Sequence, residues 1–456
     1  MEATNRVMAL TFKGGIRSIG FKNTAMCRIE RLTPPANVFI MVNDGVATRK
    51  YNAHRVPVAK IGERVFRGQV IADTSGDEEG CPLHASVSGT ISDIYEDGDG
   101  RTFIVIENDM KYENAPTLSP IGKKLTECST EEIIDVIRRA GIVGLGGRGY
   151  PTYKKIKEAV GRVEFCIINC AESEPFLTSD HRLLIEKPAS VLNGLKILLK
   201  ALGLRSGIVA VGEDKHNAAE KLRELVGDSG MIKVREFCSK YPQGAEELIV
   251  YSLTGRELRA DETPIDAGGV VFNTQTSEAI FNAFATGMPL TSRVITVDGD
   301  CIAHPSNLLV PIGAKISDIL AHCGGFIKTP AVIISGGPLS GRAVTEDDVI
   351  TPETRAIIVL SDDVAFTGRD AGNDLGVCIR CGRCVSACPM RLAPNYIAAY
   401  SRMEKYTATV PYGLKRCIEC GCCAYVCPGC VPIVGLVRRA KEALSVDAGE
   451  KQEEVH

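Results

Sequence analysis

The stretch CIRCGRCVSACP, residues 378–389, decides the fold of the C-terminal part of this chain, and it returns as CIECGCCAYVCP at residues 417–428. Both copies have the spacing C-x2-C-x2-C-x3-C-P, in which three thiolates of one run surround one [4Fe–4S] cube and the fourth ligates the neighbouring cube. The predicted ligands are the four cysteines of each run: Cys378, Cys381, Cys384 and Cys388, then Cys417, Cys420, Cys423 and Cys427. Zinc ribbons use CxxC pairs, but they have no use for the third and fourth cysteines. The sequence therefore predicts two clusters that conduct electrons.

Composition limits the classes of protein to which the chain can belong. Its 456 residues suffice for several domains, and a net charge of −3 supplies no basic face for nucleic acid. Eighteen cysteines, eight of them in cluster spacing, favour a reducing compartment over a secreted disulfide scaffold. We find no signal peptide, and no apolar run approaches the ~18 residues of a membrane helix. We expect a cytoplasmic protein that reaches a membrane only through partners.

The N-terminal region, residues 1–112, is predicted to contain a small all-β domain. VAKIGERVFRGQVIA at 58–72 and HASVSGTISDI at 84–94 have short apolar segments separated by glycine turns. These stretches resemble the barrel-sandwich hybrid domain of lipoyl and biotinyl carriers. His84-Ala85-Ser86 stands where a carrier presents its modified lysine. We expect a structural or docking module without a lipoyl or biotinyl group.

Residues 113–290 are predicted to form an α/β domain. Ser129 followed by Glu132 is typical of a capping box at the start of a helix. The apolar run 163–168 and the stretch GIVAVG at 207–212 predict buried strands separated by helices. This alternation predicts a mostly parallel sheet, which binds ligands at the carboxyl ends of its strands.

The rest of the chain completes a multidomain α/β protein. Residues 291–345 have the pattern strand, strand with helix, strand, and they resemble a small β-grasp domain of the soluble-ligand-binding type. We expect a linker over 346–372, a ferredoxin-like α domain with two [4Fe–4S] clusters over 373–445, and a disordered tail over 446–456.

A glycine-rich loop, GLGGRGYPT at 144–152, is the second informative motif. Its four glycines allow backbone N–H groups to approach a phosphate closely: Gly144, Gly146, Gly147 and Gly149. A plain turn is the alternative, since the loop lacks the usual order of strand and G-x-G-x-x-G.

An acidic stretch, NCAESEP at 169–175, directly follows a predicted buried strand. Carboxylates at that position, such as Glu172, are well placed to meet ribose hydroxyls, a flavin edge or a nicotinamide amide. A solvated junction between strand and loop is the alternative interpretation.

Together with YPQGAEE at 241–247 and VFNTQT at 271–276, these motifs resemble the flavin- and NADH-binding subunit of respiratory complex I. The N-terminal barrel, the β-grasp domain and the doubled cysteine run make the chain even more similar to the C subunit of the Rnf complex, the ferredoxin:NAD oxidoreductase. This second resemblance covers roughly residues 11 to 440.

The resemblance implies roles for individual residues. The four glycines would wrap the flavin phosphate and the dinucleotide, with Lys155 as a charged phosphate partner. Asn169, Asn273 and Thr276 would hold FMN, and Gly244 would allow close approach to it. Tyr150 would stack on the NADH rings, while Glu174 and Glu246 would face the nicotinamide. The chain departs from the complex I pattern at Arg148, Ala171, Ala245 and Thr274, which puts FMN affinity and nucleotide preference in question.

NADH supplies two electrons as a hydride, whereas an iron–sulfur cube accepts one at a time, and a flavin converts one mode into the other. We therefore expect the peripheral NADH-linked subunit of an ion-translocating Rnf-type complex, with NAD(H), FMN and two [4Fe–4S] clusters as cofactors. Its expected partners are membrane-embedded subunits and, indirectly, ferredoxin. One alternative is a soluble flavin/iron–sulfur reductase of a corrinoid enzyme or an amino-acid reductase. Another is an electron-carrying adaptor that does not bind NADH.

The cysteines outside the two runs have a different expected role. Cys422 and Cys430 lie beside the second run but out of its register, so they are predicted to pack rather than to ligate. Cys166 and Cys170 flank the end of an apolar strand and are predicted to be small buried hydrophobes.

Overall fold

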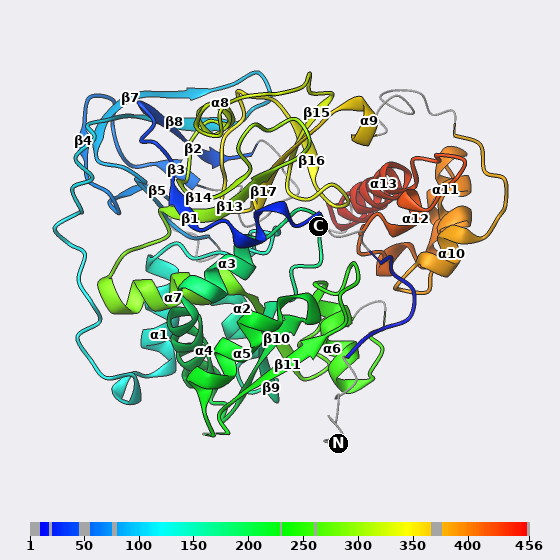
Figure 1. Cartoon of the computed structure of the whole chain (residues 1–456), viewed down its shortest axis with the longest axis horizontal. Coiled ribbons are helices and arrows are strands. Elements are labelled where there is room, and N and C mark those ends of the chain that lie inside the picture. The colour runs from blue at the N-terminus through cyan, green and yellow to red at the C-terminus, as the bar shows by residue number, and fades with distance from the viewer. Residues whose placement is uncertain are drawn as a thin grey trace.

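The computed structural model describes residues 10–17, 21–44, 55–74, 80–228, 230–259, 262–365 and 376–453. Figure 1 shows a β-rich half above a helical and sheet half, with the helices of the C-terminal region at one side. Among the described residues, no helix is both long enough and apolar enough to cross a membrane.

The N-terminal β domain consists of two small antiparallel sheets with the strand orders β2-β8-β7-β4 and β3-β5-β6. Its strands are β2 (Asn37–Asn43), β3 (Arg55–Pro57), β4 (Arg64–Val65), β5 (Val70–Thr74), β6 (Leu83–His84), β7 (Gly89–Glu96) and β8 (Thr102–Asn108). Alternate residues of β2 are buried, as expected for a strand with one face in the core. The buried Ser86 donates a hydrogen bond to the Ile312 carbonyl at 2.6 Å, so this domain packs against a later part of the chain.

The α/β domain contains a four-stranded parallel sheet with the order β11-β10-β9-β12, which confirms the predicted parallel sheet. Its strands are β9 (Phe165–Cys170), β10 (Gly207–Gly212), β11 (Ile232–Phe237) and β12 (Gly269–Asn273). Its helices are η2 (Leu125–Glu127), α1 (Thr130–Arg139), α2 (Thr152–Ala159), α3 (Ser179–Glu186), α4 (Pro188–Leu202), η3 (Glu213–Lys215), α5 (His216–Val226), α6 (Glu246–Thr254) and α7 (Thr274–Thr286). The capping box at Ser129 and Glu132 is present.

Helices cover both faces of this sheet. Apolar residues of α1, α4 and α7 join one hydrophobic core with Cys166 and Ile168 of β9. Ile167 of β9 points to the opposite face, where Ile249 and Val250 of α6 pack.

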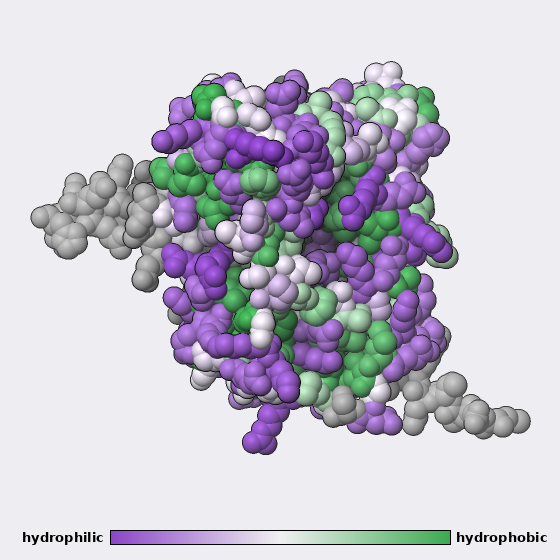
Figure 2. All heavy atoms as spheres, turned by 90° about the vertical axis from the view of Figure 1, so that its left-hand side faces the viewer, coloured by the Kyte–Doolittle hydropathy of each residue, from purple (hydrophilic) through white to green (hydrophobic). Residues whose placement is uncertain are grey.

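Figure 2 shows a face of the whole molecule on which hydrophobic side chains form separate patches among hydrophilic ones.

The third domain is a six-stranded sheet with the order β1-β14-β13-β17-β15-β16. Its elements are β1 (Ile29–Arg31), β13 (Ser292–Asp298), β14 (Ser306–Pro311), α8 (Ile316–His322), β15 (Val332–Ser335), β16 (Arg342–Val344), β17 (Ala356–Leu360) and α9 (Asp362–Ala365).

Part of the predicted linker belongs to this sheet. β17 lies in the middle of the sheet between β13 and β15, so residues 346–360 belong to this domain rather than to the predicted linker. β1 of the N-terminal region also joins the sheet by pairing with β14. Both strands gain partners far away in sequence, which a local pattern does not reveal. Residues 366–372 of the predicted linker and residues 373–375 of the predicted cluster domain lie outside the described residues.

The cysteine domain, residues 376–453, is helical. Its elements are α10 (Arg383–Ala387), α11 (Pro394–Arg402), η5 (Tyr406–Tyr412), η6 (Leu414–Arg416), α12 (Cys422–Tyr425) and α13 (Ile433–Glu453). Ile397 of α11 packs with Leu436 and Val437 of α13 in its core. The helix α13 extends to Glu453, within the predicted tail 446–456, whose last three residues lie outside the described part of the chain.

The N-terminal segment connects these domains. η1 (Asn23–Met26) precedes β1, and Leu10 forms a parallel bridge with Phe237 at the end of β11. Ile16 bridges to Tyr241, and the Gly15 N–H donates to the Ala387 carbonyl of the cysteine domain at 2.9 Å. The segment therefore holds the cysteine domain against the α/β domain.

Candidate functional site

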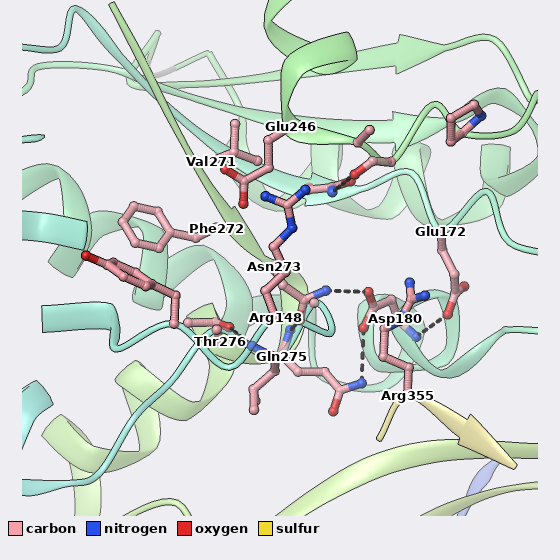
Figure 3. A pocket seen from close by; sticks show the side chains of 18 of the residues that line it. Arg148, Glu172, Asp180, Glu246, Val271, Phe272, Asn273, Gln275, Thr276 and Arg355 are labelled. Atoms are coloured by element: carbon pink, nitrogen blue, oxygen red, sulfur yellow. Dashed lines mark hydrogen bonds between the residues drawn. The ribbon is translucent and has the colours of Figure 1, made fainter. Parts of the chain in front are cut away.

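A cavity of about 460 Å³ lies at the carboxyl ends of β9 and β12, where parallel sheets bind ligands. Three domains contribute to its wall. Most lining residues belong to the α/β domain, while Arg293, Ser340 and Arg355 come from the six-stranded sheet domain. Ile418 and Cys420 come from the cysteine domain. Figure 3 shows several of these side chains pointing into the same space.

Tertiary folding brings most of the predicted site residues into this wall. Those that line it are Gly144, Gly146, Tyr150, Lys155, Asn169, Glu172, Glu174, Gly244, Glu246, Asn273 and Thr276. Gly147 and Gly149 do not line it. Both have positive φ angles, +109° and +64°, so they are needed for the shape of the loop.

The glycine-rich loop is closed on itself and fastened to the start of α7. The Gly144 N–H donates to the Tyr150 carbonyl at 2.8 Å. The Leu145 N–H donates to the hydroxyl of Thr276 at 2.9 Å. Thr276 thus positions the loop. Because Gly144 and Gly146 have no side chains, they leave the cavity open on this side.

Asn169 joins two of the predicted motifs. Its amide donates to the Gly244 carbonyl at 2.8 Å, and its Oδ1 accepts a hydrogen bond from the Ala171 N–H at 3.2 Å. The Gly244 N–H in turn donates to the Ser173 hydroxyl at 3.1 Å. These hydrogen bonds therefore hold the end of β9 and the loop before α6 together.

Glu172 caps the helix α3. Its carboxylate accepts hydrogen bonds from the N–H groups of Asp180 at 2.8 Å and His181 at 3.1 Å. A carboxylate at a helix N-terminus satisfies free N–H groups and interacts favourably with the helix dipole. Glu172 has the unusual φ of +38°, so the surrounding contacts hold the backbone in this conformation.

Two lysines, the half-buried Lys22 and the buried Lys215, hold the loop that follows β9. The Lys22 ammonium donates to the carbonyls of Glu172 at 3.0 Å and Glu174 at 2.9 Å, and also to that of Leu177. Lys215, only 2% exposed, donates to the Ala171 carbonyl at 3.0 Å. Burial, with repulsion from Lys215, lowers the pKa of Lys22 to about 8. Sequence analysis missed both lysines because no local motif marks them.

Glu174 connects the α/β domain to the six-stranded sheet domain. Its carboxylate, 3% exposed, accepts hydrogen bonds from the N–H groups of Leu339 at 2.8 Å and Ser340 at 3.1 Å and from the Ser340 hydroxyl at 3.1 Å. Arg355 lies 3.8 Å away. The carboxylate is thus engaged by the connection between β15 and β16.

Lys155 and Glu246 pair with each other. The Lys155 ammonium lies 2.7 Å from both carboxylate oxygens of Glu246, and it also donates to the Val271 carbonyl at 2.6 Å. The Tyr150 hydroxyl donates a hydrogen bond to the carboxylate of Glu158, which also lines the main cavity. A cation, two carboxylates and an aromatic ring therefore stand together on one side of the cavity.

Asp180 and Arg293 are two buried ionisable residues in the wall of this cavity, and sequence analysis missed both. Asn273 and Gln275 donate side-chain hydrogen bonds to Asp180 at 2.8 and 3.1 Å (Figure 3). Burial, with the nearby charge of Glu172, raises the pKa of Asp180 to about 6. Burial lowers the pKa of Arg293 to about 9. Its guanidinium donates to the Leu145 carbonyl at 3.3 Å and so supports the glycine-rich loop.

The fourth cysteine of the first run, Cys388, lies beside the cysteines of the second run. Cys388 lines a small pocket together with Cys417, Cys420 and Cys423 of the second run. Burial raises the pKa of the Cys384 thiol, and the neighbouring thiols of Cys427 and Cys378 raise it further. Among the described residues, no three ligating side chains are close enough for a single metal ion. Four thiolates drawn from two C-x2-C-x2-C-x3-C-P runs are the donor set that [4Fe–4S] cubes use.

The other cysteines pack. Cys422 is buried with Ile16, Tyr241 and Ala387, where the N-terminal segment meets the cysteine domain. Cys166 and Cys170 are fully buried, and burial raises the pKa of both thiols. The predicted packing roles of these three cysteines are confirmed, and Cys430 is half-buried.

Four family models match the chain in succession. They are the RnfC barrel sandwich hybrid domain over residues 10–111, the Nuo51 FMN-binding domain over 137–282, the SLBB domain over 294–343 and the 4Fe-4S dicluster domain over 371–428. The chain is 34% identical to the C subunit of the Na(+)-translocating ferredoxin:NAD(+) oxidoreductase complex of Acetobacterium woodii, over 87% of this chain and 88% of that protein. The chain belongs to the RnfC family.

Two further members of the RnfC family show the same extent of similarity. The C subunit of the proton-translocating ferredoxin:NAD(+) oxidoreductase complex of Clostridium ljungdahlii is 36% identical over 88% of this chain and 86% of its own length. The C subunit of the ion-translocating oxidoreductase complex of Rhodobacter capsulatus is 32% identical over 99% and 85%. An NAD+-reducing [NiFe]-hydrogenase structure aligns with a TM-score of 0.47 and 18% identity, over 62% of this chain and 54% of that one.

The family matches agree with the position of the cavity. Its predicted residues from Gly144 to Thr276 all lie within the FMN-binding domain, and Cys420 lies within the dicluster domain. Because Gly144 and Gly146 lack a Cβ, their backbone can approach a ligand in the cavity closely. Together with the Arg355 and Lys155 cations, they suit a phosphate-bearing flavin.

Proposed function

We propose that this protein is the peripheral electron-transfer subunit of an ion-translocating ferredoxin:NAD oxidoreductase, passing electrons between NAD(H), FMN and two [4Fe–4S] clusters. The observation that carries the proposal is the shared wall of the main cavity. Loops of the FMN-binding domain and Cys420 of the dicluster domain line the same 460 Å³ space. Electron transfer requires such proximity between a flavin and its first cluster.

FMN, when bound, supplies the exchange between hydride transfer and single-electron transfer. The chain's residues hold and orient the reactants. Gly144, Gly146 and Asn169 would contact FMN, as would Asn273, which is held by Asp180. Tyr150, Glu174 and Glu246 would act on the nicotinamide side.

Lys155 and Glu246 neutralise each other in the ligand-free protein, and an arriving phosphate would compete with Glu246 for the ammonium. This exchange keeps the Lys155 ammonium paired with an anion both before and after phosphate binds. It also frees the Glu246 carboxylate to accept a hydrogen bond from the nicotinamide end.

The two clusters would follow one another in a fixed order. The cluster of Cys388, Cys417, Cys420 and Cys423 adjoins the cavity through Cys420. The other cluster includes Cys378 and Cys381, which are exposed. Electrons from NADH would therefore reach the second run first and leave through the first run.

We also propose the finer features that the family implies. The six-stranded sheet domain would be a β-grasp domain, and the cysteine domain would be ferredoxin-like. The protein would reside in the cytoplasm on the inner face of the cell membrane, held by membrane-embedded subunits of an Rnf-type complex and linked through them to ferredoxin.

The test is anaerobic reconstitution with iron, sulfide and FMN, followed by NADH:ferricyanide assays. One FMN, about eight irons per chain and NADH oxidation would support the proposal. Intact clusters without FMN binding or NADH oxidation would contradict it and favour an electron-carrying adaptor. Zinc bound in place of iron would contradict the clusters themselves.

A further inference from the structure

The segment 10–17 lies between the α/β domain and the cysteine domain, and Figure 1 shows it in dark blue beside the orange helices. At one end the Cys238 N–H donates to the Leu10 carbonyl at 2.9 Å. At the other end Ile16 and Tyr241 exchange two backbone hydrogen bonds, at 2.8 and 2.9 Å. Tyr241 lines the main cavity. The segment is therefore fixed to the α/β domain at both ends and, through Tyr241, to the wall of the main cavity.

Two glycines between these ends contact the cysteine domain. The Gly15 N–H donates to the Ala387 carbonyl at 2.9 Å. Gly14 has a φ of +76°, and a Cβ added to it would lie 2.6 Å from the Cys388 carbonyl oxygen and 3.0 Å from the carbonyl carbon. Non-bonded heavy atoms do not approach so closely, so only a residue without a Cβ fits here. Gly14 thus packs directly against the backbone of a predicted cluster ligand.

Lys240 holds the segment from the other side. Its ammonium donates to the carbonyls of Phe12 and Gly14, the second at 2.9 Å, and it lies 4.0 Å from the centre of the Phe12 ring. An aromatic face attracts a cation in this position. A Cβ added to Gly15 would lie 2.5 Å from the Tyr241 carbonyl oxygen. The backbone at the two glycines therefore packs tightly between the α/β domain and the cysteine domain.

This contact joins the two parts of the protein between which electrons would pass. Cys388 lies in a small pocket with cysteines of the second run, and one of these, Cys420, also lines the main cavity. An ion pair between Arg391 and Glu257 joins the same two domains at 2.6 Å. Both of its side chains are about half exposed, so it contributes little to the position of the cysteine domain. The packed contact at Gly14 is better suited to fix that position.

We propose that the segment 10–17 fixes the distance between the flavin site and the cluster of the second run, with Gly14 as a positioning residue for Cys388. This inference rests on the proposed function. Electron transfer between two cofactors slows steeply as they move apart. A side chain at position 14 would push the Cys388 backbone away, whereas the residues that bind FMN and NADH would keep their places. Loss of the Lys240 ammonium would have a similar effect, because the segment would lose a donor that holds it.

The experiment uses two variants of the full chain, each with a matched control. Gly14→Ala is compared with Gly161→Ala, because Gly161 has a similar φ of +73° and no atom within 4 Å of an added Cβ. Lys240→Met is compared with Lys233→Met, at an exposed lysine of β11.

Four quantities are measured on protein reconstituted with iron, sulfide and FMN. FMN and iron contents show whether the cofactors are held. NADH:ferricyanide activity at saturating ferricyanide reports reduction of the flavin. Stopped-flow absorbance follows reduction of the clusters by NADH, and freeze-quench EPR identifies which cluster is reduced.

Both variants should keep FMN, about eight irons per chain and the NADH:ferricyanide rates of their controls. Reduction of the second-run cluster by NADH should slow about tenfold to a hundredfold, because a misplacement of about 1 Å between reacting groups can cost a factor of about 100. The EPR signal that changes should be the one that Cys388→Ala alters. A loss of stability alone would not separate the two rates in this way.

Cluster reduction at the control rate in both variants, with both EPR signals unchanged, would overturn the inference while leaving the proposed function intact. Equal slowing of ferricyanide and cluster reduction would also overturn it, because the effect would then lie at the flavin. If Gly14→Ala loses iron, Lys240→Met decides, since it adds no atom beside Cys388. Wild-type protein that binds no FMN or oxidises no NADH would overturn the proposed function and, with it, this inference.

Discussion

The Glu174 carboxylate accepts a hydrogen bond from the Leu339 N–H at 2.8 Å and thereby joins the end of β9 to the six-stranded sheet domain. Glu174 was predicted from sequence as a group beside the nicotinamide. Its oxygens are also engaged by a neighbouring domain, so its influence on catalysis would pass partly through the position of that domain.

Glu174→Gln should weaken this contact, because a neutral amide oxygen replaces the charged carboxylate that accepts from the two N–H groups. A lost charged hydrogen bond costs about 1.5–3 kcal/mol. We expect a lower midpoint of thermal unfolding together with slower NADH oxidation, while FMN content and iron content stay unchanged. Slower NADH oxidation at unchanged thermal stability would instead place Glu174 in direct contact with nicotinamide.

Lys22→Met should loosen the loop that carries Glu172 and Glu174, since three carbonyls lose their common donor. We expect FMN to dissociate more readily, with an increase in its dissociation constant of about tenfold. Flavin fluorescence titration measures this change. Lys60→Met, at an exposed lysine of the N-terminal β domain, is the control. FMN affinity equal to that of the control would show that the loop keeps its shape without Lys22.

Gly147→Val should abolish FMN binding. Gly147 has a φ of +109°, which costs a branched residue of the order of 1–3 kcal/mol, and an added Cβ would lie 3.3 Å from the Arg355 Nε. Gly161→Val is matched to it, because Gly161 also has positive φ but has no atom within 4 Å of an added Cβ. Both variants should lose stability, and only Gly147→Val should lose flavin. Retained flavin in Gly147→Val would mean that the loop does not hold the phosphate.

Cys388→Ala should damage the cluster held by Cys417, Cys420 and Cys423, because Cys388 lies with these thiols. EPR spectroscopy of the reduced variant should show one altered and one intact cluster signal. Cys427→Ala should alter the other signal. If Cys388→Ala changed the same signal as Cys384→Ala, the exchange of fourth ligands would be disproved.

Asp180 should make stability depend on pH in the acidic range. Burial and Glu172 raise its folded pKa to about 6, above its value of 3.8 in an unfolded chain. Between these values the folded state binds more protons, so the contribution of Asp180 to stability is present at low pH and is lost as pH rises to about 6. In urea unfolding from pH 4 to 7, wild type should lose on the order of 1–3 kcal/mol relative to Asp180→Asn. A difference independent of pH would contradict this assignment.

Local patterns in the sequence, together with the family resemblance, were enough to predict the chemistry and most of the residues that line the main cavity. The doubled cysteine run, the glycine-rich loop and the acidic end of β9 each depend on closely spaced residues, so their pattern is visible without the fold. The capping box at Ser129 and the parallel sheet followed in the same way, because capping and strand alternation are local properties.

Only the tertiary structure decided which distant residues form hydrogen bonds with these motifs. Lys22 reaches the Glu172 carbonyl across 150 positions, and Leu339 reaches Glu174 across 165. β17 was mistaken for linker because its partners, β13 and β15, are set by sheet pairing. Such contacts depend on how separate elements pack, and packing brings together residues between which the sequence contains no spacing rule. Local sequence therefore determined the chemical motifs. The fold determined which side chains hold these motifs in place, how the cysteine domain completes the wall of the main cavity, and how close Cys420 lies to the flavin domain.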